Sequence, residues 1–270
     1  MNITPKAYYT NVVSSLHEIN YIYLFIYYSL DILSKIVCYH NDDFFVMWKP
    51  SALPTTFGKE LCFLDILLEK EKDLKTDFSI PEKLLPYIDL PDFSPCTITK
   101  TLIKHQLDIF GKDEEIGLLN RLDNETAGFL YFAKSKEAFE KYRRLQSEGK
   151  INKRYVAQIK WTPKESAFEI TMPIMHHKHK VDRMISVRSP KDELKGRSKV
   201  HHPITIVKVL HTDKTTDITT LLVGIYKWVR HQIRVHLAGI GYPVLWDTLY
   251  GKNTQSGNLC LWSLGFQIEE

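Results

Sequence analysis

The stretch GLLNRLDNETAGFLYFAKS, Gly117–Ser135, places the charged residues Arg121 and Asp123 before a strongly apolar run. The run GFLYFA, Gly128–Ala133, has the length and composition of a buried β-strand. Asp123 stands shortly before that strand and follows the apolar approach Ile116–Leu119. We therefore expect this carboxylate to lie at the mouth of the core, where burial makes a charge costly unless an opposite charge faces it.

The sequence around this strand predicts further strands and helices. The segment SKEAFEKYRRLQSEGK is typical of a surface helix with Ser135 as N-cap and Gly149 as the C-terminal glycine. Residues 36–48 predict a hairpin around the Asn41–Asp43 turn, whereas residues 61–109 show little periodicity apart from one short amphipathic helix. Strands outnumber helices and do not alternate with them, which favours an α+β fold. Further strands are predicted at Lys153–Ile159 and Thr219–Tyr226, and a helix at Val229–Pro243.

The composition suits a globular protein. The chain has 270 residues, 44% of them hydrophobic and 25% charged, and its formal net charge of +4 permits a nucleic-acid partner without requiring one. The four cysteines lack the spacing of a zinc site or disulfide framework, and no secretory signal stands out, so we expect buried thiols and a cytoplasmic location. The apolar segment Ile19–Leu33 is too short and interrupted for a membrane anchor, which favours a packed element or a stray extension. We expect one domain at 36–270, preceded by an extension at 1–35.

Four motifs in order carry a family resemblance. NRLDNETAGFLYFAKS resembles the His-Arg-Leu-Asp-x-x-Thr-Ser-Gly-Leu-Leu-x-Phe-Ala-Lys signature of the RluA-type pseudouridine synthases. Three more segments are similar to that family's motifs: DDFFVMWKPSALPT at 42–55, KRYVAQI at 153–159 and RHQIRVHLAGIGYPVLWDTLYG at 230–251. The resemblance covers the chain from about residue 36 to its end. It implies a mixed, mainly antiparallel sheet with flanking helices and an active cleft across the sheet, and the isomerisation of uridine in RNA without metal or cofactor.

The resemblance also implies roles for single residues. Asp123 matches the catalytic aspartate, and a carboxylate can attack the sugar or the base, or stabilise a cationic sugar. Arg234 matches the motif arginine, and we expect it to form a salt bridge with Asp123 that keeps the carboxylate ionised. Tyr155 matches the active-site tyrosine, whose ring can stack on uracil and whose hydroxyl can relay the C5 proton. Arg121 matches the arginine that fills the gap left by a flipped nucleotide. Further RNA contacts are expected from Lys153, Arg230, His231 and Gln232.

The match departs from the family pattern at several positions. Asn120 stands where the family usually has histidine, and Ala127 where it has a small polar residue. Trp228 and Trp246 replace glycines near the third motif. Because glycine is often used where φ is positive or space is short, these two changes bear on how RNA is positioned. The trio of Asp123, Tyr155 and Arg234 is intact.

Lysines, arginines and histidines gather in MHHKHKVDRM, Met175–Met184, and in KDELKGRSKVHH, Lys191–His202. A metal site is disfavoured there because the interleaved lysines repel a cation. A solvated loop and an arm that contacts phosphates are both compatible with this pattern. The expected partner is ribosomal or transfer RNA, and the chain is expected to act as a monomer without a membrane contact.

Two other functions are compatible with the sequence. A protein that keeps the fold and binds RNA without turnover is suggested by Trp228 and Trp246. A nucleoside or glycoside hydrolase would need a second essential carboxylate some 5–10 Å from Asp123. Only Asp123 has a strong setting for that role in the sequence.

Overall fold

The computed structural model describes residues 33, 36–58, 61–68, 78–88, 90, 92–197, 199–251 and 257–268. The predicted extension at 1–35, with its apolar segment, therefore lies almost entirely outside the described residues. Within the described part, no helix is both long enough and apolar enough to cross a bilayer.

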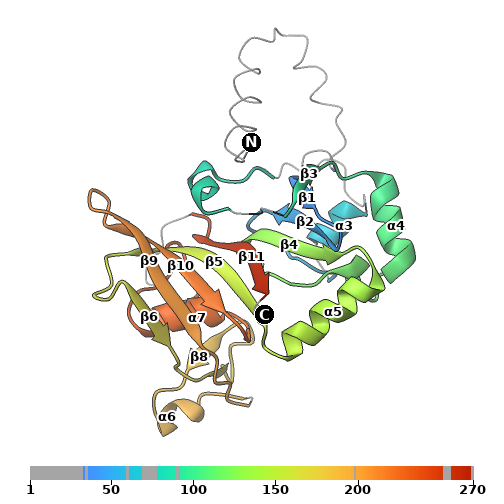
Figure 1. Ribbon diagram of the computed structural model, residues 1–270. Coiled ribbons are helices and arrows are strands. Elements are labelled where there is room, and N and C mark those ends of the chain that lie inside the picture. Colours follow the sequence, from blue (N-terminus) through green and yellow to red (C-terminus); the bar gives the residue numbers. More distant parts are fainter. Residues whose placement is uncertain are drawn as a thin grey trace.

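A twisted nine-stranded sheet forms the body of the molecule, with strand order β3-β1-β2-β4-β11-β5-β10-β9-β6 (Figure 1). Among the described strands of this sheet, only β4 and β11 pair in parallel, and the remaining neighbours are antiparallel. The predicted mixed, mainly antiparallel α+β fold is confirmed. The strands are β1 Cys38–His40, β2 Phe44–Lys49, β3 Ser94–Cys96, β4 Ala127–Ala133, β5 Ile151–Lys160, β6 Ala167–Ile170, β9 Thr205–Asp213, β10 Ile218–Ile225 and β11 Leu261–Ile268.

Helices flank the sheet at its two ends (Figure 1). The predicted surface helix is α5, in which the Ser135 hydroxyl accepts a bond from the N–H of Ala138 and Gly149 has a φ of 75° after the last turn. A second helix, α4, was not predicted, because its buried stripe includes the polar Gln106 and proline-rich sequence precedes it. The helices are α3 Phe63–Leu67, α4 Lys100–Phe110, α5 Lys136–Ser147, α6 Pro190–Glu193 and α7 Gln232–Gly239, with short 3-10 turns η3 Glu82–Tyr87 and η4 Glu115–Gly117.

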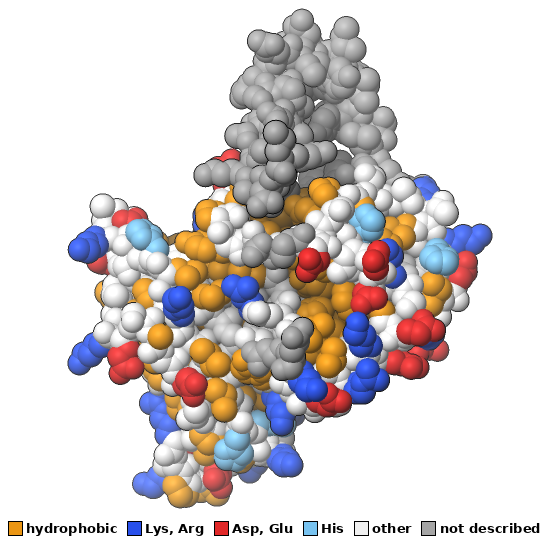
Figure 2. All heavy atoms as spheres, viewed as in Figure 1, with side chains coloured by type: hydrophobic (Ala, Val, Ile, Leu, Met, Phe, Trp, Pro, Cys, Tyr) orange, Lys and Arg blue, Asp and Glu red, His pale blue; other side chains and the backbone are white. Residues whose placement is uncertain are grey.

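A small second sheet projects from the body below β6 and β9 (Figure 1). It pairs β7, Ile174–His176, with β8, Met184–Ser186, and is followed by α6. We call residues 174–201 the basic arm, because they hold eight Lys and Arg against three Asp and Glu. Figure 2 shows Lys and Arg side chains along this projection.

The parallel pair β4–β11 requires a glycine. Gly128 has a φ of 136°, and a Cβ on it would lie 2.4 Å from the backbone nitrogen of Ser263 on β11. We expect Gly128→Ala to lower the free energy of unfolding by about 3 kcal/mol, because it adds both backbone strain and a clash with a strand. Urea denaturation measures this change. Gly58→Ala is the matched control, since open space surrounds Gly58, and equal losses in the two variants would contradict the prediction.

Candidate active site

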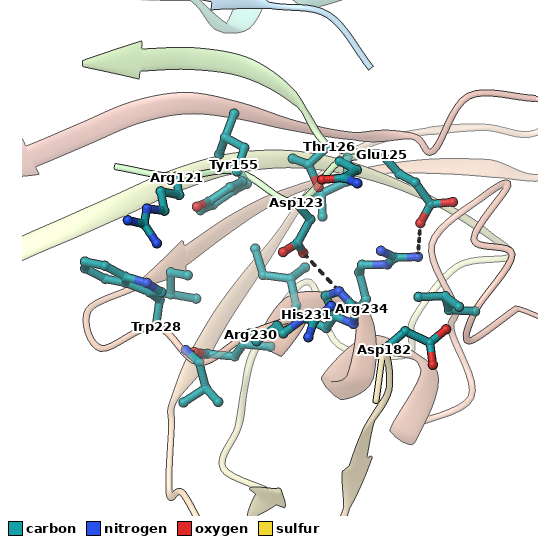
Figure 3. Close-up of a pocket in the computed structure, with 18 of the residues that line it drawn as sticks. Arg121, Asp123, Glu125, Thr126, Tyr155, Asp182, Trp228, Arg230, His231 and Arg234 are labelled. Atoms are coloured by element: carbon teal, nitrogen blue, oxygen red, sulfur yellow. Dashed lines mark hydrogen bonds and ion pairs between the residues drawn. The ribbon is translucent and has the colours of Figure 1, made fainter. Parts of the chain in front are cut away.

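An open pocket of about 730 Å³ lies between the loop before β4 and the start of α7 (Figure 3). The loop 121–126 supplies one wall and the segment 228–234 supplies the other, while Tyr155 reaches in from β5. The sheet thus brings together residues that are more than 100 positions apart in the chain. Among the predicted site residues, those that line this pocket are Arg121, Asp123, Tyr155, Arg230, His231, Gln232 and Arg234.

Asp123 lies near the centre of this pocket, and its side chain is 31% exposed (Figure 3). The loop that carries it is held at β4 by the Thr126 N–H, which donates to the Asp123 carbonyl. Tyr155 is buried beside it. Burial raises the pKa of Tyr155, and the charge of Asp123 raises it further, so the phenol keeps its proton. The pocket therefore offers a solvent-accessible carboxylate and a protonated hydroxyl on an aromatic ring.

A lysine that the sequence prediction left without a role supports the Asp123 loop. Lys49 is fully buried at the end of β2, and its ammonium donates to the carbonyls of Pro50, Leu53 and Asn124. These three acceptors use all three N–H groups of the ammonium. Because Asn124 follows Asp123 directly, this buried lysine fixes the backbone next to the carboxylate. The Lys-Pro pair in DDFFVMWKPSALPT was the available signal.

The imidazole of His231 lies beside Asp123. Its Nε2 lies 3.8 Å from an Asp123 carboxylate oxygen, and its Nδ1 lies 2.8 Å from the Tyr250 hydroxyl. That hydroxyl accepts a bond from the Met184 N–H, so its own proton is free to bond Nδ1. This network assigns the ring proton to Nε2, which faces Asp123. Burial lowers the pKa of His231, although the charge of Asp123 opposes the shift.

Arg234 does not form the predicted salt bridge with Asp123. Its Nε and Nη2 donate to the two carboxylate oxygens of Asp247 at 2.8 and 2.7 Å, and Nη2 also donates to Glu125 at 2.6 Å. The fork of a guanidinium suits this bidentate pairing, and Asp247 is further fixed by the N–H groups of Leu249 and Tyr250. Arg234 is thus committed to two other carboxylates, Asp247 and Glu125, and Figure 3 shows its pair with Glu125 in the pocket wall.

The helix that carries Arg234 is shorter than predicted. It begins at Gln232, and His231 before it has a left-handed φ of 55°. Arg230 therefore lies outside the helix and does not share a face with Arg234. Its guanidinium donates to the carbonyl of Val181 in the basic arm, which links the arm to the pocket wall.

Comparison with known proteins places this geometry in a family. The sequence model of the family described as RNA pseudouridylate synthase matches residues 43–239. The chain belongs to this family. The predicted RluA-type assignment is confirmed, and an isomerase acting on RNA is the enzyme class of the named relatives.

Two related sequences and one solved structure resemble this chain. An uncharacterized RNA pseudouridine synthase of Aquifex aeolicus is 31% identical over 78% of this chain and 63% of its own length. A ribosomal large subunit pseudouridine synthase D of Buchnera aphidicola is 33% identical over 50% of this chain and 39% of its own length. The chain thus spans less than two thirds of these two relatives. The solved structure of human RNA pseudouridylate synthase domain containing 1 has the same fold, with a TM-score of 0.58, 20% identity and coverage of 87% of this chain and 79% of that one.

Two residues that were predicted to contact RNA, Lys153 and Gln232, are buried and make their contacts inside the protein. Lys153 is only 4% exposed, and its Nζ lies 3.2 Å from the centre of the Trp228 ring, so the ammonium faces an indole and not the pocket. Gln232 is buried, and its amide accepts from the Val229 N–H and donates to the Ile204 carbonyl and the Thr205 hydroxyl. Both placements depart from the prediction.

Arg121 stands at the rim of the pocket with a highly exposed side chain. Its Nη2 and Nε donate to Glu115 at 2.7 and 3.2 Å. An exposed ion pair of this kind is weak, so the guanidinium can leave Glu115 at little cost. Of the two tryptophans at family glycine positions, Trp246 takes a φ of 62°, which a glycine would adopt without strain.

The buried lysine gives a pH-dependent prediction. Burial, with the charge of Arg143 adding to it, lowers the pKa of Lys153 from 10.5 to about 7. Between pH 7 and pH 10.5 the unfolded chain binds the Lys153 proton more tightly than the folded chain does. The free energy of unfolding therefore rises with pH across this window, and this gain is lost as the pH falls through 7. We expect Lys153→Met to flatten this rise in urea denaturation series between about pH 7 and pH 9. Lys160→Met, at the exposed end of the same strand, is the control, and equal slopes in both variants would contradict the assignment.

Proposed function

We propose that this chain converts specific uridines of structured RNA to pseudouridine, with Asp123 as the nucleophile. The observation that supports this most strongly is the position of the Asp123 carboxylate in an open pocket, beside the protonated Tyr155 and the neutral His231. In this proposal a carboxylate oxygen attacks C1′ of the ribose as the C1′–N1 bond breaks. The detached uracil turns, C5 displaces the carboxylate as the C1′–C5 bond forms, C5 loses its proton and N1 gains one.

The surrounding residues have separate tasks in this mechanism. Tyr155 packs its ring against the uracil, and its hydroxyl accepts one proton while it donates another, which suits the transfer from C5. His231 turns its Nε2 toward Asp123 at 3.8 Å, so a polar ring faces the carboxylate without a full positive charge. Such a charge would draw electron density from the nucleophile.

Base flipping is proposed because an enzyme that does chemistry on a base in a duplex must take that base out of its stack. Arg121 at the rim offers a planar cation that can fill the space of the flipped nucleotide. The cost of breaking its exposed pair with Glu115 is small, about 1 kcal/mol or less.

The basic arm is proposed to contact RNA phosphates. It carries its excess positive charge next to the pocket, to which the Arg230–Val181 hydrogen bond links it. Neutralisation of phosphates by lysine and arginine is the main sequence-independent source of RNA affinity. Ribosomal RNA is the first substrate to test, because the Buchnera relative is named for the ribosomal large subunit; transfer RNA is the second.

The test compares total RNA from cells with the intact gene and from cells carrying Asp123→Asn. Pseudouridines are mapped by carbodiimide adducts and reverse-transcription stops. The loss of one or a few stops in the variant would support the proposal, and the lost positions would name the substrate. An unchanged set of stops, together with purified protein that binds RNA and modifies none of it, would favour an RNA-binding protein without turnover.

A further inference from the structure

Trp228 is a large apolar side chain left exposed in the pocket wall. It is 39% exposed and lines the same pocket as Asp123 and Tyr155 (Figure 3). Trp228 has no role in the proposed bond-making steps or proton transfers. A large aromatic side chain that lines a pocket and stays exposed offers a flat face to a ligand that carries a ring.

The indole is held in place from beneath. The Lys153 ammonium, on β5, lies 3.2 Å from the ring centre and is itself almost completely buried. This contact sets the Lys153 amine against one face of the indole and supports the ring from the β5 side. Because the ammonium takes one face of the ring, the opposite face is left for a group that enters the pocket.

The pocket has room for such a group. Its volume of about 730 Å³ lies within the range of roughly 300–1,000 Å³ that holds a whole drug-sized ligand, which is larger than one nucleobase. The neighbours of Trp228 in the lining include the cations Arg121 and Arg230, which suit the phosphates on either side of a base.

We infer that Trp228, supported by Lys153, is a stacking platform for an unpaired base next to the target uridine. Every base has a face that can stack on an aromatic ring, so this subsite would select an unpaired nucleotide rather than a particular sequence. The inference rests on the proposed function, since an RNA substrate is what brings a neighbouring base into this pocket. Trp228 would act as a positioning residue and take no part in bond making.

The test distinguishes base stacking from the electrostatic attraction between the protein and the RNA phosphates. The probes are a fluorescein-labelled uridine decamer and an abasic ribose-phosphate decamer with the same phosphates and no bases. Binding is measured by anisotropy in the Asp123→Asn background, so that no turnover alters the probe. Trp228→Leu removes the ring, Trp228→Phe keeps an aromatic platform, and Trp161→Leu removes an indole that is 59% exposed outside the pocket.

We expect Trp228→Leu to reduce the preference for the uridine decamer over the abasic decamer about tenfold, as the loss of one stacked base predicts. Trp228→Phe should keep most of that preference, and Trp161→Leu should keep all of it. The abasic strand should bind the leucine variant about as well as its parent, because this strand has no base to stack on the indole.

Two results would overturn the stacking subsite: an equal loss of affinity for both decamers in Trp228→Leu, or a wild-type protein with no preference between them. Neither depends on catalysis. If the RNA map shows no lost pseudouridine while the decamer preference still falls in Trp228→Leu, the proposed turnover fails and the subsite stands. If the map shows lost positions and the preference is unchanged, the subsite fails and the turnover stands.

Discussion

Asp123→Asn is expected to slow pseudouridine formation by at least about 10³-fold, because an amide neither attacks C1′ nor carries the charge of a carboxylate. The substitution changes one oxygen to nitrogen on a partly exposed side chain, so the fold should remain intact. The measurement is single-turnover release of tritium from RNA labelled at C5 of uridine. RNA affinity should change little.

Asp182→Asn is the matched control for this experiment. Asp182 is another aspartate in the lining of the same pocket, but it belongs to the basic arm and is absent from the motif that carries Asp123. We expect its rate to stay within about threefold of the wild-type rate. A comparable collapse in both variants would indicate paired carboxylates, as a glycoside hydrolase requires.

Asp247→Ala is expected to lower the free energy of unfolding by about 3–5 kcal/mol. The carboxylate is fully buried and accepts bonds from Arg234 and from the N–H groups of Leu249 and Tyr250. Its removal leaves a buried guanidinium with Glu125 as its remaining charged partner, and breaking a buried pair on one side carries a cost of this size.

The control for Asp247→Ala is Glu125→Gln, which removes the half-exposed partner of the same guanidinium. Solvent screens that contact, so the expected loss is about 1 kcal/mol. Both values come from urea denaturation at neutral pH. Similar small losses in the two variants would show that Arg234 is not held mainly by Asp247.

Elements whose formation depends on residues close together in the chain could be predicted from local sequence patterns. The buried run before Ser135, the cap at that residue and Gly149 each appear in the structure where the sequence places them. Alternation along β5 could also have placed Lys153 correctly. Lys153 and Tyr155 are two residues apart, so they point to the same buried face of the strand.

The pairings between distant residues could not be predicted in the same way. Three carboxylates lie near Arg234, and the sequence does not show which of them the guanidinium selects. That choice depends on the turn that brings Asp247 beside α7, and on the left-handed His231 that delays the start of the helix. The helix α4 was missed because a buried Gln106, whose amide donates to the Ala133 carbonyl, interrupts its apolar stripe.

Reconstitution tests most directly whether this chain forms pseudouridine through Asp123. RNA from cells that lack this gene is incubated with the purified chain, and the pseudouridines of that RNA are mapped at single-nucleotide resolution. We predict that the wild-type protein restores the missing pseudouridine at its position without added metal or cofactor, and that Asp123→Asn restores none. Restoration by the Asp123→Asn protein, or a failure of the wild-type protein to modify RNA that it binds, would contradict the account.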